Sequence, residues 1–317
     1  MTSAIQNAVA VAVGATGFFF MREYFKGGVC SSQARMEGKT VLITGCNTGI
    51  GKETVMDLSQ RGARVIMACR NLELANEAAA EVKKKTKGDI VVYKLDLANL
   101  SSVRECAKEI NVKEEKIDVL INNAGVMMCP YSKTEDGFEM QIGTNHLGHF
   151  LFTNLLLDKL MDSAPSRVVT VSSRAHERGK MDLEDLHAEN KKYNRMEAYE
   201  QSKLANIHFT RELSKRLKGT GVTTYALHPG VVRTELGRHI EQIIGPLKYL
   251  FIPLLFPFTK SPKEGAQTSI YCAVEESIAS ESGNYYSDCA IKTPQPQALD
   301  DKVAEKLWEV SSKSVDL

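Results

Sequence analysis

A tyrosine and a lysine four positions apart, Tyr199 and Lys203, are the residues of this sequence best suited to proton chemistry. On a helix, positions four apart share one face, so both side chains can point into the same cleft. A nearby ammonium group favours phenolate over phenol and lowers the pKa of the tyrosine. Such a tyrosine can pass a proton near neutral pH. Because a Y-x-x-x-K spacing also arises by chance, the pair needs support from the rest of the chain.

A glycine-rich turn upstream indicates what else the cleft holds. The turn reads TGCNTGIG over residues 44–51, follows an apolar run and opens a helix-like segment. Glycines there let the backbone approach a pyrophosphate, and the N-terminus of the following helix favours its negative charge. A dinucleotide is therefore predicted to bind here. The turn residues assigned to it are Gly45, Asn47, Thr48, Gly49, Ile50 and Gly51.

The end of the next strand-like segment bears on the choice between NAD and NADP. It reads Ala68-Cys69-Arg70-Asn71 and lacks the carboxylate that usually binds the ribose hydroxyls of NAD. Cys69 would not repel a 2′-phosphate, and Arg70 could hold one by charge-assisted hydrogen bonds. We therefore expect NADP(H) as the cofactor. The alternative is that Arg70 is a solvated residue at the start of a helix.

The elements that must position these groups alternate along the chain. Near-continuous apolar strands separated by helices predict a parallel sheet covered on both faces. The expected class is α/β, with a single doubly wound parallel sheet of the Rossmann type and helices on both faces. The predicted strands are 40–44, 65–68, 90–93, 119–121, 168–171 and 222–227, and the predicted helices include 72–85 and 101–110.

Composition excludes several classes of protein. The 317 residues are 43% hydrophobic and 25% charged, as in an ordinary globular protein, and suffice for one large or two small domains. A net charge of +1 gives no field that points to nucleic acid. The seven cysteines form no C-x-x-C pair, so neither a disulfide framework nor a zinc site is expected. His146 and His149 lack an evident third ligand, so a packing or hydrogen-bonding role is the better interpretation and no metal is predicted.

The N-terminus has a different character. Residues 8–21 read AVAVAVGATGFFFM, an uncharged run shorter than the roughly 20 residues that a spanning helix needs. Arg22, Lys26 and Arg35 follow it. We interpret residues 1–21 as a membrane-associating or targeting segment, leaving open an uncleaved anchor, a membrane-surface helix or a targeting signal. A buried N-terminal helix is the alternative. Residues 22–37 then form a linker, and 38–317 form the folded domain.

A second apolar segment interrupts the domain. Residues 243–258 read IIGPLKYLFIPLLFPF, with Lys248 as the one charge. Three prolines make a spanning helix improbable. The segment follows the strand that ends near Leu227, on the side of the sheet where ligands bind. We interpret about 236–262 as an apolar lid over a lipophilic substrate, with an interface or a surface-packed insert as the alternative.

Taken in order, the motifs resemble those of a known family. The glycine turn, Asn122-Asn123-Ala124-Gly125, Asn145, Ser172-Ser173, the Tyr199–Lys203 pair and Pro229-Gly230 are similar to the short-chain dehydrogenases/reductases over residues 38 to about 290. The stretches ACRN, NNAGVMMCP, AYEQSKLAN and LHPGVVRTELGRH resemble the NADP-using retinol dehydrogenases. KGGVCSSQA and SAPSRVVTVSS look most like their mitochondrial, type-13 branch.

The resemblance implies a role for each matching residue. Tyr199 would donate the proton in reduction and accept it in oxidation, and Lys203 would lower its pKa and bind the nicotinamide ribose. Ser173 would hydrogen-bond the substrate carbonyl. Asn145 would hold a water that relays protons through Lys203. For the cofactor, the resemblance implies Asp96 and Leu97 at the adenine, Asn123, Ala124 and Gly125 along its length, and Pro229, Gly230, Val232 and Thr234 near the nicotinamide.

The activity that the resemblance implies is NADP(H)-dependent interconversion of retinal and retinol, mainly as reduction of all-trans-retinal. The alternatives are reduction of other lipophilic carbonyls, such as steroids or lipid aldehydes, and a non-catalytic scaffold that senses NADP(H). The expected partners are a retinoid and a membrane, without nucleic acid, and a homodimer is left open. The mitochondrial inner membrane is favoured as the location, with the endoplasmic reticulum as the alternative.

Overall fold

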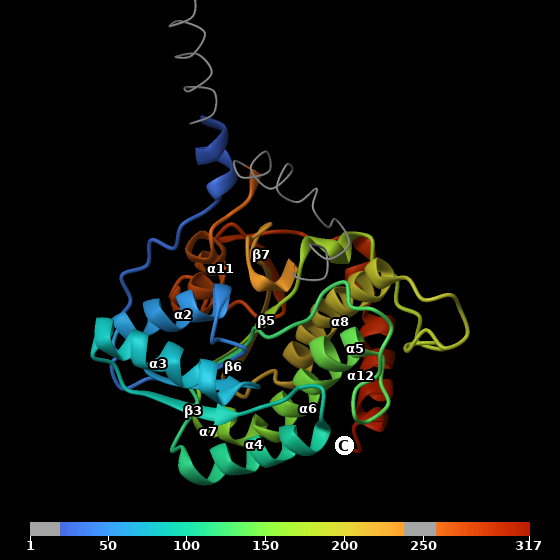
Figure 1. Cartoon of the computed structure of the whole chain (residues 1–317), viewed down its shortest axis with the longest axis horizontal. Coiled ribbons are helices and arrows are strands. Elements are labelled where there is room, and N and C mark those ends of the chain that lie inside the picture. The colour runs from blue at the N-terminus through green and yellow to red at the C-terminus, as the bar shows by residue number, and fades with distance from the viewer. Residues whose placement is uncertain (1–19, 238–257) are drawn as a thin grey trace, which may run out of the picture.

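A single twisted sheet forms the centre of the computed structural model, which describes residues 20–237 and 258–317 (Figure 1). The strand order is β3-β2-β1-β4-β5-β6-β7-β8. Strands β1 to β7 run parallel, which confirms the predicted doubly wound α/β sheet. The strands are β1 (Thr40–Thr44), β2 (Arg64–Cys69), β3 (Ile90–Lys94), β4 (Val119–Asn122), β5 (Ser166–Val171), β6 (Val222–His228), β7 (Asn284–Ser287) and β8 (Ala290–Ile291).

The last edge of the sheet departs from the prediction of parallel strands alone. β8 pairs antiparallel to β7. The two residues between these strands, Asp288 and Cys289, have φ of 53° and 57°. Positive φ at both central positions is the geometry of a tight hairpin turn, so the chain reverses at once. The all-parallel prediction is therefore wrong at this edge.

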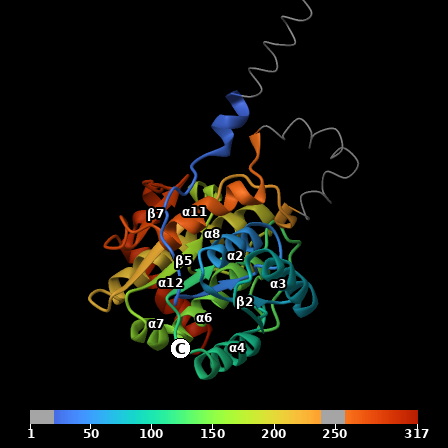
Figure 2. The same cartoon turned by 90° about the vertical axis from the view of Figure 1, so that its left-hand side faces the viewer.

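Helices cover both faces of the sheet, as Figures 1 and 2 show. Successive residues of β1 point to opposite sides: Val41 and Ile43 lie in one hydrophobic core and Leu42 in the other. The first core is covered by α2 (Gly49–Gln60), α3 (Leu72–Thr86) and α11 (Pro262–Val274), and the second by α4 (Leu100–Lys113), α6 (Gly148–Leu155), α8 (Arg195–Arg216) and α12 (Asp301–Ser314). Shorter elements are α5 (Met140–Ile142), η1 (Gly143–Leu147), α7 (Leu157–Asp162), η2 (Arg174–Glu177), η3 (Glu235–Gly237) and η6 (Pro296–Leu299).

Helix α8 is set in place by its N-cap and by burial on all sides. The Asn194 side chain accepts hydrogen bonds from the backbone N–H groups of Met196 and Glu197. From Ala198 to Thr210, every residue of the helix is buried. An interior helix of this kind has little freedom to rotate, so the side chains that it presents toward the sheet are held in fixed positions.

Residues 22–36, within the segment predicted to be a linker, lie against the folded domain. Arg22 forms an ion pair with Glu264 at the start of α11. The backbone N–H of Cys30 donates to Gln267 Oε1 at 3.1 Å. This segment therefore follows the surface of α11 before it enters β1.

Two glycines allow this segment to cross the β7–β8 turn at close range. A Cβ on Gly28 would lie 1.9 Å from the carbonyl oxygen of Asp288. Gly27 has φ of 70°, and a Cβ there would lie 2.5 Å from Lys260 Nζ. Lys260 also pairs with Asp288. Side chains at positions 27 and 28 would therefore force the two chains apart.

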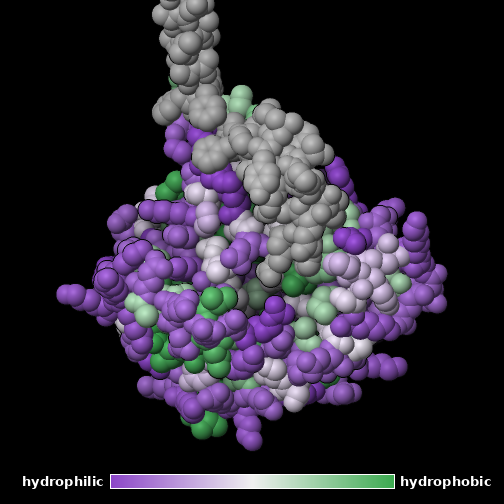
Figure 3. Space-filling view, in the orientation of Figure 1, coloured by the Kyte–Doolittle hydropathy of each residue, from purple (hydrophilic) through white to green (hydrophobic). Residues whose placement is uncertain are grey.

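Two predicted segments fall mainly outside the described residues. These are the N-terminal membrane-associating segment, of which residues 1–19 are not described, and the lid, of which 238–257 are not described. The ends of the lid insertion meet beside α11, where Lys260 N–H donates to the Val231 carbonyl at 2.7 Å. In residues 20–237 and 258–317, no helix is both long and apolar enough to cross a membrane. The face in Figure 3 is mostly hydrophilic, with hydrophobic side chains in separate patches.

Candidate active site

A cleft of about 500 Å³ opens at the carboxyl ends of β1, β2 and β4. Ligands bind at this edge in doubly wound sheets, where the strand order reverses. Segments that are far apart in the sequence meet here: the turn after β1, the end of β2 and the loops after β3, β4 and β6. The predicted cofactor residues that line it are Gly45, Asn47, Thr48, Gly49, Ile50, Gly51, Arg70, Asp96, Leu97, Asn123, Ala124, Gly125 and Thr234.

The glycine turn has the geometry of a phosphate cradle. Gly45 and Gly49 have φ of 60° and 58°, a backbone conformation that other residues rarely adopt. Thr48 is the N-cap of α2, and its side chain accepts no capping hydrogen bond. Thr48 therefore leaves the backbone N–H groups of the first turn available. A Cβ on Gly51 would lie 2.7 Å from the Cα of Cys46. An uncapped helix N-terminus behind a close-packed glycine turn fits the pyrophosphate of a dinucleotide.

Arg70 stands at the end of β2 with its side chain exposed along the cleft. Its backbone carbonyl accepts a hydrogen bond from Lys94 Nζ at 2.5 Å. No carboxylate lies among the four residues from Ala68 to Asn71. The position that would bind ribose hydroxyls in an NAD site is thus occupied by a cation suited to a phosphate.

A hydrogen-bond network centred on Thr44 fastens β4 to the glycine turn. Its Oγ1 accepts the backbone N–H groups of Asn123 and Ala124, both at 3.0 Å. The Asn123 side chain donates to the carbonyls of Thr44 and Gly45, at 2.9 and 3.0 Å. His149 Nε2 lies 2.8 Å from the same Oγ1. Asn123 therefore braces the turn, and His149 has a hydrogen-bonding role of the kind expected.

Tyr199 and Ser173 lie close to one another. Tyr199 is 5% exposed, and the Ser173 side chain is near enough to lower the pKa of its phenol. The neighbouring Ser172 turns the other way and donates its hydroxyl to the Lys203 carbonyl at 2.6 Å. Of the two serines, Ser173 thus shares the site with Tyr199, because successive residues at the end of β5 point to opposite faces.

Asn145 joins the site from η1, a π-helical turn. Such turns are rare and occur often at functional sites. The Asn145 amide group donates to the Val126 carbonyl at 3.0 Å and to Ser202 Oγ at 2.9 Å. A Cβ on Gly125 would lie 3.1 Å from Asn145 Oδ1 and 3.5 Å from Lys203 Nζ. Asn145 and Lys203 are therefore neighbours across Gly125.

The direction of the Tyr199 pKa differs from the one that the Tyr199–Lys203 spacing predicts. Burial raises the pKa of Tyr199 to about 12, against a smaller lowering by the hydrogen bond with Ser173. Burial also lowers the pKa of Lys203 to about 8. The Lys203 Nζ lies 5.7 Å from the centre of the Tyr199 ring and donates to the Val171 carbonyl. Desolvation therefore dominates the pKa of both groups.

Five predicted cofactor residues are not among the residues that line the cleft. Tyr199 and Lys203 lie on α8. Pro229, Gly230 and Val232 lie in the loop after β6, where a Cβ on Gly230 would lie 2.6 Å from the Lys260 side chain. The other lining residues were given no cofactor role from the sequence: some lie within the stretches ACRN, NNAGVMMCP and LHPGVVRTELGRH, and the rest reach the cleft through the fold. They are Asn71, Leu74, Leu95, Val126, Met127, Cys129, Pro130, Ser132, Met140, Thr144, Glu235 and Leu236, besides Ala68.

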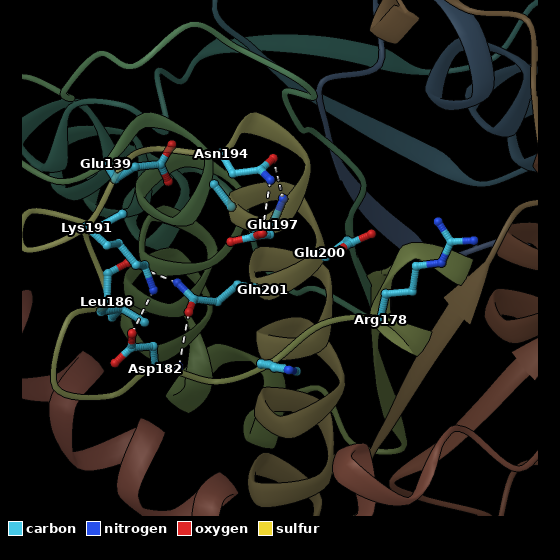
Figure 4. Close-up of a pocket in the computed structure, with 12 residues that line it drawn as sticks. Glu139, Arg178, Asp182, Leu186, Lys191, Asn194, Glu197, Glu200 and Gln201 are labelled. Carbon is cyan, nitrogen blue, oxygen red and sulfur yellow. Dashed lines mark hydrogen bonds and ion pairs between the residues drawn. The ribbon is translucent and has the colours of Figure 1, made fainter.

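A second cavity, of about 410 Å³, lies beside the first turns of α8 (Figure 4). Its side chains are mostly charged or polar, and several pair with one another. Lys191 forms an ion pair with Asp182, and Asn194 donates to Glu197 at 2.9 Å. Tyr199 is not among its lining residues. A polar lining of this kind suits water better than a lipophilic substrate.

Known proteins share both the sequence and the fold. The short chain dehydrogenase family model matches residues 39–243. Retinol dehydrogenase 12 of Homo sapiens is 54% identical over 292 residues, which cover 92% of this chain and 90% of that protein. Retinol dehydrogenase 13 of Homo sapiens is 49% identical over 320 residues, covering 98% and 94%. Sequence identity is thus higher to type 12, whereas type 13 aligns with a larger share of this chain. The comparisons therefore support the group that contains both types.

Solved structures agree with this result. A putative uncharacterized protein from Mycobacterium paratuberculosis superimposes with a TM-score of 0.74 at 37% identity, covering 92% of this chain and 98% of that one. The Pseudomonas aeruginosa RhlG/NADP active-site complex superimposes with a TM-score of 0.64 at 25% identity, covering 83% and 98%. The family match, the identity to the retinol dehydrogenases and the shared fold agree with one another. The chain belongs to the short-chain dehydrogenase family and, within it, to the retinol dehydrogenase group.

Proposed function

We propose that this protein is an NADP(H)-dependent oxidoreductase that interconverts retinal and retinol, acting mainly as an all-trans-retinal reductase. The observation that carries the proposal is that Asn145 and Lys203 lie against Gly125, which lines the dinucleotide cleft. Tyr199 lies next to Lys203, and Ser173 lies next to Tyr199. The relatives named retinol dehydrogenase, at about half identity over most of the chain, support the substrate class.

The proposed roles follow from the positions of these side chains. A bound NADPH would supply the hydride that reduces the aldehyde carbon. Ser173 would donate a hydrogen bond to the carbonyl oxygen, and Tyr199 would transfer its phenolic proton to that oxygen. Lys203 and Asn145 would return a proton from water to Tyr199. A Tyr199 pKa of about 12 keeps the phenol protonated at neutral pH, the state in which it can donate a proton. The reductive direction is proposed from the family resemblance and from a cellular NADP(H) pool that is held mostly reduced.

NADP(H) is proposed on account of Arg70. Its exposed guanidinium lies along the cleft at the end of β2, beside Cys69 in place of an acidic residue. The RhlG relative was solved with NADP, which agrees with this assignment. Asp96 and Leu97 line the cleft near Arg70 and are proposed to hold the adenine.

The lining of the cleft bears on the choice of substrate. Met127 adds an apolar wall to the cleft. Steroids or lipid aldehydes would suit the same wall, and a panel of carbonyl substrates distinguishes them from retinal.

We propose membrane association through residues 1–21, at the mitochondrial inner membrane ahead of the endoplasmic reticulum. A fluorescent protein fused behind residues 1–38 would test it, since a diffuse cytosolic signal would contradict both locations.

Replacement of Tyr199 tests the chemistry directly. Purified protein should oxidise NADPH when all-trans-retinal is added, and Tyr199→Phe should lower this rate at least a thousandfold, because the ring then has no proton to donate. NADPH binding, followed by its fluorescence, should persist in the variant. Tyr24→Phe is the matched control, since Tyr24 is 81% exposed and far from the cleft in sequence. Normal turnover by Tyr199→Phe would contradict the mechanism, and cofactor binding without turnover of any carbonyl by the parent would favour the sensing scaffold.

A further inference from the structure

Two cysteines that the proposed mechanism does not use lie side by side beneath the cofactor cleft. Cys46 belongs to the glycine turn and Cys69 is the last residue of β2. Their sulfur atoms are 3.7 Å apart, and the backbone N–H of Cys46 points at Cys69 Sγ from 3.4 Å. A disulfide needs a sulfur separation of about 2 Å, so closing the gap takes rotation of the two side chains and a small approach of the two backbones.

The pair is buried but lies one residue away from the wall of the cleft. Cys46 is fully buried and Cys69 is 1% exposed. The residues on either side of each cysteine nevertheless line the cleft: Gly45 and Asn47 beside Cys46, and Ala68 and Arg70 beside Cys69. A molecule as small as hydrogen peroxide, once in the cleft, would have to pass a single layer of backbone to reach the sulfur atoms.

The two sulfurs differ in the way that thiol oxidation requires. The hydrogen bond from the Cys46 side chain lowers the pKa of Cys69, and backbone N–H groups of Cys46, Asn47 and Gly45 add to this effect against burial. Cys69 thus has the sulfur that more readily becomes a thiolate, the reactive form. Burial raises the pKa of Cys46 well above its usual value, so Cys46 remains a thiol and can act as the resolving partner.

We propose that Cys46 and Cys69 form a reversible disulfide in response to hydrogen peroxide and that this modification weakens cofactor binding. The Cys69 thiolate attacks one peroxide oxygen, the O–O bond breaks, and the hydroxide that leaves takes up a proton to become water. Cys69 is then a sulfenic acid. Cys46 Sγ attacks the Cys69 sulfur, the S–O bond breaks, and the leaving hydroxyl takes the Cys46 proton as a second water. Two thiols have lost two electrons and one peroxide has gained them.

The packing of the glycine turn would carry this change to the cofactor site. Cys46 donates from its sulfur to the Ile43 carbonyl at 3.2 Å, a contact that the disulfide would break. A Cβ on Gly51 would lie only 2.7 Å from Cys46 Cα, so the turn and the first residues of α2 have no free space between them. A shift of Cys46 toward Cys69 therefore moves the backbone that the pyrophosphate is proposed to contact.

The disulfide can be mapped without any assumption about activity. The full chain, purified under reducing conditions, is treated with hydrogen peroxide and digested with trypsin under non-reducing conditions. Cys46 and Cys69 fall in separate peptides, residues 40–52 and 65–70, so their cross-link gives one new species that dithiothreitol resolves. We expect this species at close to one per chain, and we expect NADPH bound beforehand to slow its formation, because it covers the entrance.

The effect on the cofactor rests on the proposed NADP(H) site and is measured separately. NADPH affinity should fall at least tenfold after peroxide and recover with dithiothreitol. In Cys69→Ala, compared with its own untreated sample, peroxide should leave the affinity unchanged, and in Cys46→Ala the cross-linked peptide should be absent. Cys106→Ala is the control, since Cys106 is also a buried thiol, with a pKa raised to about 12 by burial, and should respond like the parent.

Three results would overturn the proposal. The disulfide would be excluded if Cys46 and Cys69 could still be alkylated after peroxide treatment and denaturation while other cysteines were oxidised. A cross-link that leaves NADPH affinity unchanged would exclude its effect on the turn. A fall in affinity that persists in Cys69→Ala would assign the sensitivity to another residue. An untreated protein that binds no NADPH would contradict the proposed function instead, while the peptide map would still decide the disulfide.

Discussion

At the scale of single residues, burial decides the chemistry of the Tyr199–Lys203 pair. Four-residue spacing places the two side chains on one face of α8, but each loses water there. The neutral phenol and the neutral amine are both favoured by desolvation, so the pKa of Tyr199 rises to about 12 and that of Lys203 falls to about 8. Lys203, with its pKa at about 8, then becomes the group of the pair that titrates nearest to neutral pH.

The first prediction at this scale concerns the pH profile. Below about pH 8, Lys203 is charged and can support proton transfer, and above it the ammonium is lost while Tyr199 stays protonated. The kcat of retinal reduction should therefore be flat from pH 6.5 to 7.5 and fall above an apparent pKa of about 8. Lys203→Arg, which keeps its charge, should lower kcat but remove this fall. The profile is measured with saturating NADPH, and an unchanged fall in Lys203→Arg would assign it to another group.

At the scale of elements, α12 holds α8 in place from the side opposite the sheet. Trp308 of α12 stacks on Phe209 of α8 with ring centres 5.9 Å apart and contacts Phe150 of α6 at 4.8 Å. The Arg216 guanidinium lies 4.4 Å from the centre of the Trp308 ring. The C-terminal helix thus clamps the helix that presents Tyr199, although it contributes no residue to the cleft.

Trp308→Ala should loosen this clamp. We expect the free energy of unfolding to fall by about 2–3 kcal/mol, less than the 3–5 typical of a fully buried aromatic, because Trp308 is half-buried. Urea unfolding followed by circular dichroism measures it, since Trp308 is the one tryptophan of the chain and its fluorescence is lost. Val112→Ala, at a position 78% exposed, is the control. If the free energy of unfolding fell no further than it does in Val112→Ala, α12 would not belong to the part of the protein that unfolds cooperatively.

How much of these elements the sequence predicts depends on the range of the forces that form them. β1 to β6 and helices α3 and α4 follow from local apolar and β-branched patterns, which the strand and helix predictions used. β8 depends on the two-residue turn at Asp288-Cys289, and the course of residues 22–36 depends on the close approach of Gly28 to Asp288. The pKa of Tyr199 depends on burial by elements that are distant in the sequence, and its spacing to Lys203 carries no information about that burial.

At the scale of the whole molecule, buried histidines are distributed over the second core and the edge of the cleft. His146 lies 2.8 Å from Ser311 Oγ of α12, and both ring nitrogens of His208 lack a hydrogen-bond partner in the described part of the chain. Burial lowers the pKa of His146 to about 3 and that of His149 and His208 to about 4, and does the same for His228, to about 3. Each is neutral in the folded state at any pH above about 5.

Stability should therefore fall in mild acid, at a pH above the range in which carboxylates of ordinary pKa are mostly protonated. Above about pH 6.5 these histidines are neutral in both states, whereas between 6.5 and 4 the unfolded chain binds protons that the folded chain excludes. By linkage, each such histidine lowers the free energy of unfolding by about 2 kcal/mol between pH 7.5 and 5. Urea midpoints measured across this range should decline, and His208→Phe, which cannot take up a proton, should decline less steeply. A midpoint that stays constant from pH 7.5 to 5 would contradict the exclusion of protons from these buried imidazoles.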